Sequence, residues 1–242
     1  MLNLLTFRIV ACIIMLTYAS YMDLKTREIT DKLWFISSAI GIATLLYEYL
    51  FEGIPLYRGF LMILSIGITS AVSILLYYAG FYGGADAKAL ISLSLLLPLY
   101  QPLYSLYPFA PLITFNNSIF TTLILPIYFL IKNLIRMVRG EKIFQGFESE
   151  PVWKKFLVCL LGYRLDIDER KKFYFALEES VNGKRRFKIS LLRADEDYLQ
   201  GGGVWATPGV PFILYITVGF VIMILVGDLL AILIRGIFNF FR

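Results

Sequence analysis

The sequence predicts an all-α membrane protein with six transmembrane helices and a small cytoplasmic α+β or hairpin-containing domain between helices five and six. Three observations lead to this fold class. Of the 242 residues, 58% are hydrophobic and only 17% are charged, whereas a soluble domain carries about 25% charged residues. Apolar runs of about 20 residues, enough to cross the hydrocarbon core, recur along the chain. More than half of the charged residues fall within 132–207, which places the polar domain there.

The apolar runs define six spans. The first run has neither a basic start nor a small-x-small cleavage site, so we interpret it as a retained span rather than a signal peptide. Four prolines between residues 98 and 111 crowd the second half of the fourth run, which predicts an irregular end. The chain then divides into helices one to five at 1–138, the polar domain at 139–207, and helix six with the C-terminus at 208–242. The expected spans are 3–22, 33–51, 58–80, 87–107, 117–137 and 210–235.

The polar domain carries one strong local signal. Asn182-Gly183 separates two runs that fit strands, and Asn-Gly between such runs is typical of a two-residue β-hairpin turn. A domain of this size has room for only a small hydrophobic core. We interpret the two cysteines, Cys12 and Cys159, as small apolar packing residues.

Basic residues in the short loops predict the orientation, because Lys and Arg are retained on the cytoplasmic side. Lys25, Arg27 and Lys32 follow the first span, and Lys88 follows the third. The opposite loop at 108–116 carries no charge. We therefore expect a multi-pass protein of the cell membrane, with both termini outside and the first, third and fifth connections in the cytoplasm.

Residue types that are scarce or absent exclude several kinds of catalytic site. The chain has no histidine and two cysteines, which excludes Ser-His-Asp and Cys-His catalysis and His-ligated zinc. Two cysteines are also too few for an all-cysteine zinc site or a disulfide framework. We expect no metal, no other cofactor and no nucleic-acid partner. Ionisable chemistry must then use Asp, Glu, Lys, Arg or Tyr.

Two aspartates stand out at the ends of spans. Asp23 ends the first span, and Asp86 opens the fourth after Gly83-Gly84-Ala85. The residues between the two aspartates suffice for two crossings and an outer loop. Both carboxyl groups are therefore expected at the same face of the membrane and at similar depth.

Paired carboxyl groups support metal-free peptide hydrolysis. One carboxylate activates a water molecule, and the other carboxylic acid protonates the carbonyl oxygen of the substrate. Two such groups about 3 Å apart do not both ionise readily, so they share one proton and titrate as a pair. Taken singly, Asp23 is also consistent with a solvated loop charge and Asp86 with a helix N-cap.

The glycines before Asp86 have a mechanical interpretation. Gly83 and Gly84 lack a Cβ, so the backbone can turn sharply there and a substrate strand can approach closely. Cleavage requires an extended peptide, and an extended peptide needs backbone hydrogen-bond partners.

The segment from Asp23 to Thr30, the Gly83-Gly84-Ala85-Asp86-x-Lys88 segment and the six spans resemble the GxGD-type aspartic proteases. Among these, the archaeal preflagellin (prearchaellin) peptidases, relatives of the type IV prepilin peptidases, are the most similar. The polar domain and the run Trp205–Phe212 fit that branch, although Ala85 stands where the pattern has Gly.

The resemblance implies that Asp23 and Asp86 are the catalytic pair. It implies a preflagellin- or prepilin-like precursor as substrate, whose basic class III signal peptide is cut just before the hydrophobic segment. Bacterial relatives also methylate the product and carry a cysteine-rich insert. That insert is absent here, so we expect no methyltransferase activity.

Other charged residues have weaker interpretations. The acidic cluster Asp195-Glu196-Asp197, with Glu178-Glu179 upstream, could attract a basic leader peptide, although a solvated loop explains it equally. Arg8, Asp228 and Arg235 lie in apolar runs and are expected to snorkel toward the headgroups, the last two as a pair.

Three alternative functions remain open at this stage. The first is a presenilin-like protease that cuts within substrate spans. The second is a proton-coupled transporter that uses the two aspartates as a relay, although transporters place such groups near the midplane and show repeats. The third is a structural assembly protein, which leaves the placement of the aspartates unexplained. The sequence does not indicate the oligomeric state.

Overall fold

A computed structural model describes residues 3–165, 173–181, 184–188 and 203–240 of the chain. The chain forms two compact units. The first contains residues 1–121 and 211–242, and the second contains residues 122–210. The first unit is helical, and the strands lie in the second.

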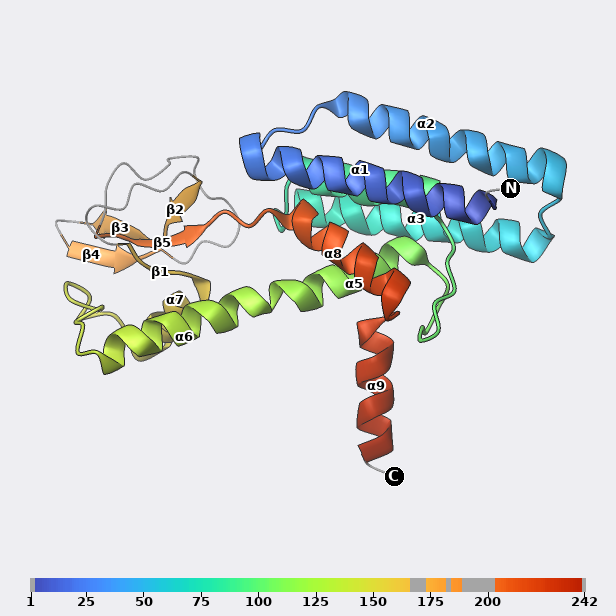
Figure 1. Ribbon diagram of the computed structural model, residues 1–242. Coiled ribbons are helices and arrows are strands. Elements are labelled where there is room, and N and C mark those ends of the chain that lie inside the picture. The colour runs from blue at the N-terminus through green and yellow to red at the C-terminus, as the bar shows by residue number, and fades with distance from the viewer. Residues whose placement is uncertain (1–2, 166–172, 182–183, 189–202, 241–242) are drawn as a thin grey trace. The chain divides into compact units, whose positions relative to one another are not determined.

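The helical unit begins with three long helices, of which α1 and α2 pack side by side (Figure 1). Asn3 caps the first helix by accepting a hydrogen bond from the Leu5 N–H (3.3 Å). A π-helical turn, η1, extends the second helix by five residues. The elements of this unit are α1 Leu4–Thr26, α2 Asp31–Tyr47, η1 Glu48–Glu52, α3 Leu56–Tyr78, α4 Gly84–Leu96, α5 Ala110–Thr122, α8 Phe212–Leu225 and α9 Leu229–Phe240.

Within the described residues, four helical segments are long and apolar enough to cross a membrane, or five if the bent pair α8–α9 counts as one span. The chain is therefore a membrane protein, but six spans are not confirmed. The expected fourth span fails the length criterion because α4 has only 13 residues. The four segments are Leu4–Thr26, Asp31–Glu52, Leu56–Tyr78 and Ala110–Val138.

The segment that follows α4 is irregular, as its prolines predict. Leu99 pairs with Phe109 as an isolated antiparallel bridge, and the Tyr100 N–H donates to the Pro108 carbonyl (2.9 Å). The Ser65 hydroxyl of α3 donates to the Pro98 carbonyl (2.7 Å). These contacts provide hydrogen-bond partners for backbone groups that would be paired inside a helix. Apolar surroundings require that such groups be paired.

Helix α4 forms the centre of the helical core, in contact with α1, α2, α3 and α8. Its small residues permit close approach of the neighbouring backbones. Gly41 of α2 is a close point of this contact, since a Cβ there would lie 2.6 Å from the Leu95 carbonyl carbon. Ser38 and Ser92 hydrogen-bond across the same contact (3.1 Å). Helix packing through small and hydroxyl residues is typical of membrane bundles.

The last apolar run is two helices, because α8 and α9 meet at an angle of 58°. Gly227 has φ of +112° at the break, a conformation that favours glycine. Asp228 is fully buried there, and its Oδ1 accepts the Leu230 N–H (3.0 Å) at the start of α9. The predicted snorkelling pair is therefore wrong, since Asp228 caps a helix and Arg235 lies over the Tyr104 ring at 5.7 Å.

Arg8 also differs from its prediction, because it does not reach the headgroups. Its side chain is 5% exposed and pairs with Glu48 of η1 (2.8 Å). Arg58 also contacts Glu48 (3.1 Å), and Thr44 accepts a hydrogen bond from the Arg8 Nε (3.2 Å). A buried guanidinium needs such a partner to offset its desolvation. Arg8 therefore connects α1 to the junction of α2 and η1.

In its described residues, the second unit contains two helices and short antiparallel strands. β5 lies between β1 and β2, and β3 pairs with β4. Val181 pairs with Lys184 at the end of the hairpin, which confirms the hairpin expected around Asn182-Gly183; these two turn residues lie outside the described part of the chain. The elements are α6 Ile124–Val138, α7 Val152–Leu161, β1 Tyr163–Arg164, β2 Tyr174–Ala176, β3 Glu178–Val181, β4 Lys184–Phe187 and β5 Trp205–Pro208.

The core of the second unit is aromatic. Trp205 is fully buried and stacks on Phe144 at 5.4 Å between ring centroids. Its indole N–H donates to the Ile143 carbonyl (3.2 Å), so its polar group is paired. Phe147 stacks on Phe187 at 4.2 Å. Cys159 belongs to this core and Cys12 to that of the helical unit, which confirms both as apolar packing residues.

Candidate active site

Asp23 lies in the last turn of α1, where the helix ends at Arg27. Arg27 has φ of +60°, and its N–H donates to the Asp23 carbonyl (3.2 Å). This left-handed C-cap brings the guanidinium back toward the helix. The Arg27 Nη1 lies 3.9 Å from the Asp23 Oδ1, and the Asp23 side chain is only 13% exposed.

Asp86 lies in the first turn of α4, three residues after the N-cap Gly83. Its Oδ2 accepts the Gly83 N–H (2.9 Å). This is a helix-capping role, as one interpretation of the sequence expected. A carboxylate at a helix N-terminus is stabilised by the helix dipole. The cap fixes the rotamer of Asp86 and orients its carboxyl group.

The turn before Asp86 obtains its sharp bend from Gly80, which has φ of +77°. Gly83 has extended backbone angles, with φ of −78° and ψ of 162°. A Cβ on Gly83 would lie 3.4 Å from the Asp86 Oδ2, and one on Gly84 would lie 3.4 Å from the Tyr77 ring. Glycine at position 83 thus leaves space beside the carboxyl group, glycine at position 84 leaves space beside the Tyr77 ring, and Ala85 is half-buried against the core.

The two carboxyl groups influence each other electrostatically. Burial raises the pKa of Asp86 to about 7, and the negative charge of Asp23 acts in the same direction. The Gly83 N–H and the Arg27 guanidinium oppose this rise. Asp86 lies in α4, which is not one of the candidate spans. Since α1 and α4 are in contact and the charge of Asp23 reaches Asp86, the structure brings the two predicted residues to one end of the bundle.

Aromatic and basic side chains surround this end of the bundle. The Tyr82 ring stacks on Phe212 at 5.7 Å, and its hydroxyl donates to the Ser73 carbonyl (3.1 Å). Lys88 forms an ion pair with Asp31, which joins the starts of α4 and α2. The wall on the Tyr82 side is therefore apolar, a setting that disfavours the ionised form of a nearby carboxyl group.

The remaining sequence candidates lie elsewhere. Asp195, Glu196 and Asp197 are outside the described residues. Glu178 is in the second unit, where it accepts hydrogen bonds from Arg185 Nε (3.0 Å) and the Trp205 N–H (3.0 Å). In the described ranges, no group of three or more Cys, Asp or Glu side chains could hold a metal ion.

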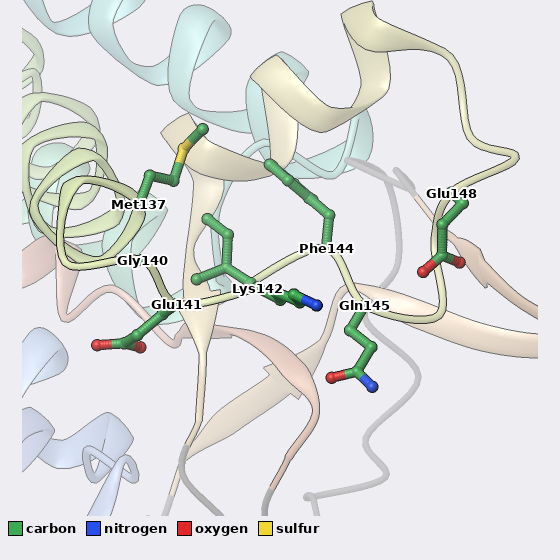
Figure 2. Close-up of a pocket in the computed structure, with 8 residues that line it drawn as sticks. Met137, Gly140, Glu141, Lys142, Phe144, Gln145 and Glu148 are labelled. Atoms are coloured by element: carbon green, nitrogen blue, oxygen red, sulfur yellow. The ribbon is translucent and has the colours of Figure 1, made fainter.

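The second unit also has an open hollow of about 510 Å³, formed by the end of α6 and the loop after it. Figure 2 shows its lining side chains, which include Met137, Phe144 and Gln145. Neither Asp23 nor Asp86 takes part. Two of its carboxylates are engaged locally, Glu141 with Arg136 (2.5 Å) and Glu148 with the Gly146 N–H (3.0 Å). We assign no chemistry to it.

Comparison with known proteins identifies the family. Residues 10–127, which include both aspartates, match the type IV leader peptidase family, and residues 154–229 match the archaeal peptidase A24 C-terminus, type II. A preflagellin peptidase of Methanococcus voltae is 30% identical over 88% of this chain and 92% of its own length. The chain belongs to the type IV leader peptidase family. Preflagellin peptidases of Methanococcus maripaludis (88% of this chain, 92% of the relative) and Methanocaldococcus jannaschii (88% and 91%) are each 26% identical.

Membership in the leader peptidase family confirms the resemblance expected from the sequence, and the chain is a peptidase. The transporter, presenilin-like and assembly-protein alternatives are not favoured. Sequence reasoning did not identify Arg27 as an electrostatic neighbour of both aspartates. Its position four residues after Asp23, one helical turn away, was the available signal.

Proposed function

We propose that this leader peptidase is an aspartic endopeptidase that removes the basic leader from preflagellin- or prepilin-like precursors, with Asp23 and Asp86 as its catalytic pair. The observation that carries this proposal is the placement of Asp23 in the last turn of α1 and of Asp86 in the first turn of α4, two helices that are in contact. The family and the names of the relatives support the choice of substrate.

The surroundings suggest a role for each aspartate. Asp86 holds the proton, because burial raises its pKa to about 7 and Asp23 adds a negative charge nearby. We assign the base role to Asp23, because the Arg27 guanidinium lies 3.9 Å from its Oδ1 and favours the carboxylate against the opposing effect of burial. Two carboxyl groups with different environments can thus divide the acid and base roles.

The reaction follows from this division of roles. Asp23 takes a proton from a water molecule, whose oxygen attacks the scissile carbonyl carbon, while Asp86 donates its proton to the carbonyl oxygen. The resulting tetrahedral diol collapses when Asp23 returns a proton to the amide nitrogen, which breaks the C–N bond. Asp86 recovers a proton from the diol hydroxyl, so the pair ends as it began. No covalent intermediate is formed.

The proposed topology has six crossings, with both aspartates at the cytoplasmic face and both termini outside. The fourth crossing starts at Ala87 and uses the rest of α4 and the segment 97–109, so that Asp86 lies at its cytoplasmic end, outside the crossing. Non-helical backbone at membrane depth needs hydrogen-bond partners within the protein, and the fully buried Leu97 and the bond from the Tyr100 N–H to the Pro108 carbonyl supply such surroundings in part of this segment. Lys25, Arg27 and Lys88 support a cytoplasmic placement of the site.

We also propose that Asp195, Glu196 and Asp197 attract the basic leader. Replacing the three by Asn and Gln should raise KM for basic leaders and leave kcat unchanged, because opposite charge aids encounter rather than chemistry. An unchanged KM at low salt would contradict this role. Glu178 is left out of the set, since its carboxylate is held inside the second unit.

Cleavage of a defined substrate tests the proposed function. The detergent-solubilised protein is incubated with a preflagellin-like precursor, and the new N-terminus is sequenced. We expect one cut at the junction between the basic leader and the hydrophobic segment. A cut inside the hydrophobic segment would favour the presenilin-like alternative.

Neutral variants of the pair test the residue assignment. Asp23→Asn and Asp86→Asn should each abolish cleavage while the protein still inserts, because each removes a proton-transfer group. Glu52→Gln is the matched control, since it neutralises an exposed carboxylate at the end of η1, and it should cleave normally. Substantial turnover by either aspartate variant would refute the assignment.

A further inference from the structure

Helix α7 exposes a stripe of large apolar side chains on the second unit. Val152 is 81% exposed, Trp153 59% and Phe156 55%. Val158, on the opposite side of the helix, is buried in the core of this unit, and Cys159 joins the same core. Since another part of α7 already packs in the core, the exposed stripe indicates that the helix contacts a second apolar environment.

The ammonium group of Lys154 lies over the Trp153 ring at 5.9 Å, and both lysines of α7 also have polar partners. Lys154 extends to Glu150 (3.1 Å), and Lys155 donates to the Glu148 carbonyl (3.2 Å). Their aliphatic stems therefore lie beside the stripe while their charged ends remain with polar partners. A short helix with Trp and Phe on one face and Lys at its border fits a membrane–water interface.

The position of α7 along α6 supports that environment. The Asn133 side chain of α6 donates to the carbonyls of Cys159 (3.1 Å) and Gly162 (2.8 Å), which fixes the C-terminal end of α7 against the middle of α6. The N-terminal half of α7 lies at the loop that follows α6, since Lys155 contacts Phe144 and Glu148 there. Trp153 is therefore level with the end of α6.

The candidate span that ends with α6 is long enough to reach the headgroup layer. The candidate span Ala110–Val138 has 29 residues, or about 43 Å of helix, whereas the hydrocarbon core is about 30 Å thick. Even when tilted, such a helix extends into the interface. Met137 and Val138 are themselves 46% and 88% exposed, so the apolar surface of α6 continues toward the stripe of α7.

We propose that the stripe of Val152, Trp153 and Phe156 lies in the headgroup region of the bilayer and anchors the second unit to the membrane surface. The occupant of this surface is lipid, because the stripe lies beside the end of a span that lipid already surrounds. The anchor holds the second unit at the membrane independently of peptide cleavage.

Tryptophan fluorescence tests the anchor with the full chain. Of the three tryptophans, Trp34 and Trp205 are 4% and 0% exposed, so Trp153 dominates accessible emission. Subtracting the fluorescence of the Trp153→Phe variant from that of the natural chain isolates the emission of Trp153. In phosphatidylcholine vesicles with brominated acyl chains, we expect this component to be lost to bromine quenching and to resist acrylamide. Acrylamide quenching without bromine quenching would overturn the proposal.

Charge insertion provides a second readout. Phe156→Glu should reduce bromine quenching of Trp153, because a carboxylate is costly in the interface. Ser180→Glu adds the same charge at an exposed site on β3, and it should leave the quenching unchanged. Equal effects of the two substitutions, or protection of Trp153 from both quenchers, would show that protein covers the stripe and would overturn the proposal.

Discussion

The aspartate Asp86 has two structural roles at once. Its Oδ2 caps α4 through the Gly83 N–H, and its carboxyl group is poised to hold a proton beside Asp23. The cap orients the group, while burial and the neighbouring charge decide its protonation. A residue that looks like an ordinary N-cap can therefore also serve as a general acid.

The pH dependence of cleavage follows from the protonated state of Asp86. Burial and Asp23 raise the pKa of Asp86 to about 7, so its proton is present below that pH and is lost above it. We expect kcat/KM to fall about tenfold per pH unit on the alkaline side of this value. A profile measured with a peptide substrate lacking groups that titrate in that range checks this. Activity that stays constant to strongly alkaline pH would contradict the acid role.

Arg27 should shift that profile. Its guanidinium lowers the pKa of Asp86 and pairs with Asp23. Arg27→Gln should move the alkaline limb to higher pH and reduce kcat about tenfold, the cost of roughly 1.4 kcal/mol in the transition state. Arg27→Lys keeps the charge, so it should restore most of kcat and most of the original position of the alkaline limb. If the Gln variant lowers kcat but leaves the limb in place, Arg27 has only a structural role.

Single residues were predictable from the sequence where local spacing carried the signal. The two aspartates could be predicted because both lie at span ends. Two crossings between them return the chain to the same face of the membrane. Glu48, the partner of Arg8, lies 40 residues away and reaches it only through packing of α1 on η1, so no local pattern pointed to it. Asp228 had a local signal, the Gly227-Asp228 pair at the break, but the apolar run around it concealed the break.

Among the elements, α4 depends on close contact with α2. Gly41→Ala would place a Cβ 2.6 Å from the Leu95 carbonyl carbon and should destabilise the fold by about 1–3 kcal/mol. It should also reduce cleavage, because α4 carries Asp86. Gly67→Ala, at an α3 position where a Cβ meets nothing within 4 Å, is the control. Thermal inactivation in detergent compares the stability of the two variants. An equal loss of stability in both would contradict the importance of the close contact between α2 and α4.

The β3–β4 hairpin is attached to β5 through Glu178. Its carboxylate accepts from Arg185 and from the Trp205 N–H, so Glu178→Gln should cost about 1–3 kcal/mol by weakening charge-assisted hydrogen bonds. Glu179→Gln changes the exposed neighbour and should have little effect. Unfolding followed by the emission of buried Trp205 compares the two. A Glu179 effect as large as that of Glu178 would contradict this role.

At the scale of elements, strong periodic and turn signals were predictive. The Asn-Gly hairpin and the irregular proline segment after α4 were confirmed because each has a local chemical cause. The order β1-β5-β2 was not predictable, because its strands are short and distant in sequence, and pairing between them depends on the buried Trp205. The length of α4 was overestimated because apolar residues continue past the point where the helix ends.

For the whole molecule, composition alone identified a membrane protein, and the residues around Asp23 and Asp86 identified the peptidase family. Apolar length could not establish six spans, since the described residues give four, or five with the bent pair. In the proposed topology α4 can be short, because the helices that surround it pair polar groups that lipid cannot.

Proximity of the two carboxyl positions is the central claim, and chemical cross-linking measures it directly. In a chain with Cys12 and Cys159 replaced by Ala, Asp23→Cys and Asp86→Cys are introduced together and treated with a short bifunctional thiol reagent. We predict an intramolecular cross-link between positions 23 and 86, identified by mass spectrometry. Absence of that cross-link, with the two thiols labelled separately from opposite sides of the membrane, would contradict the account.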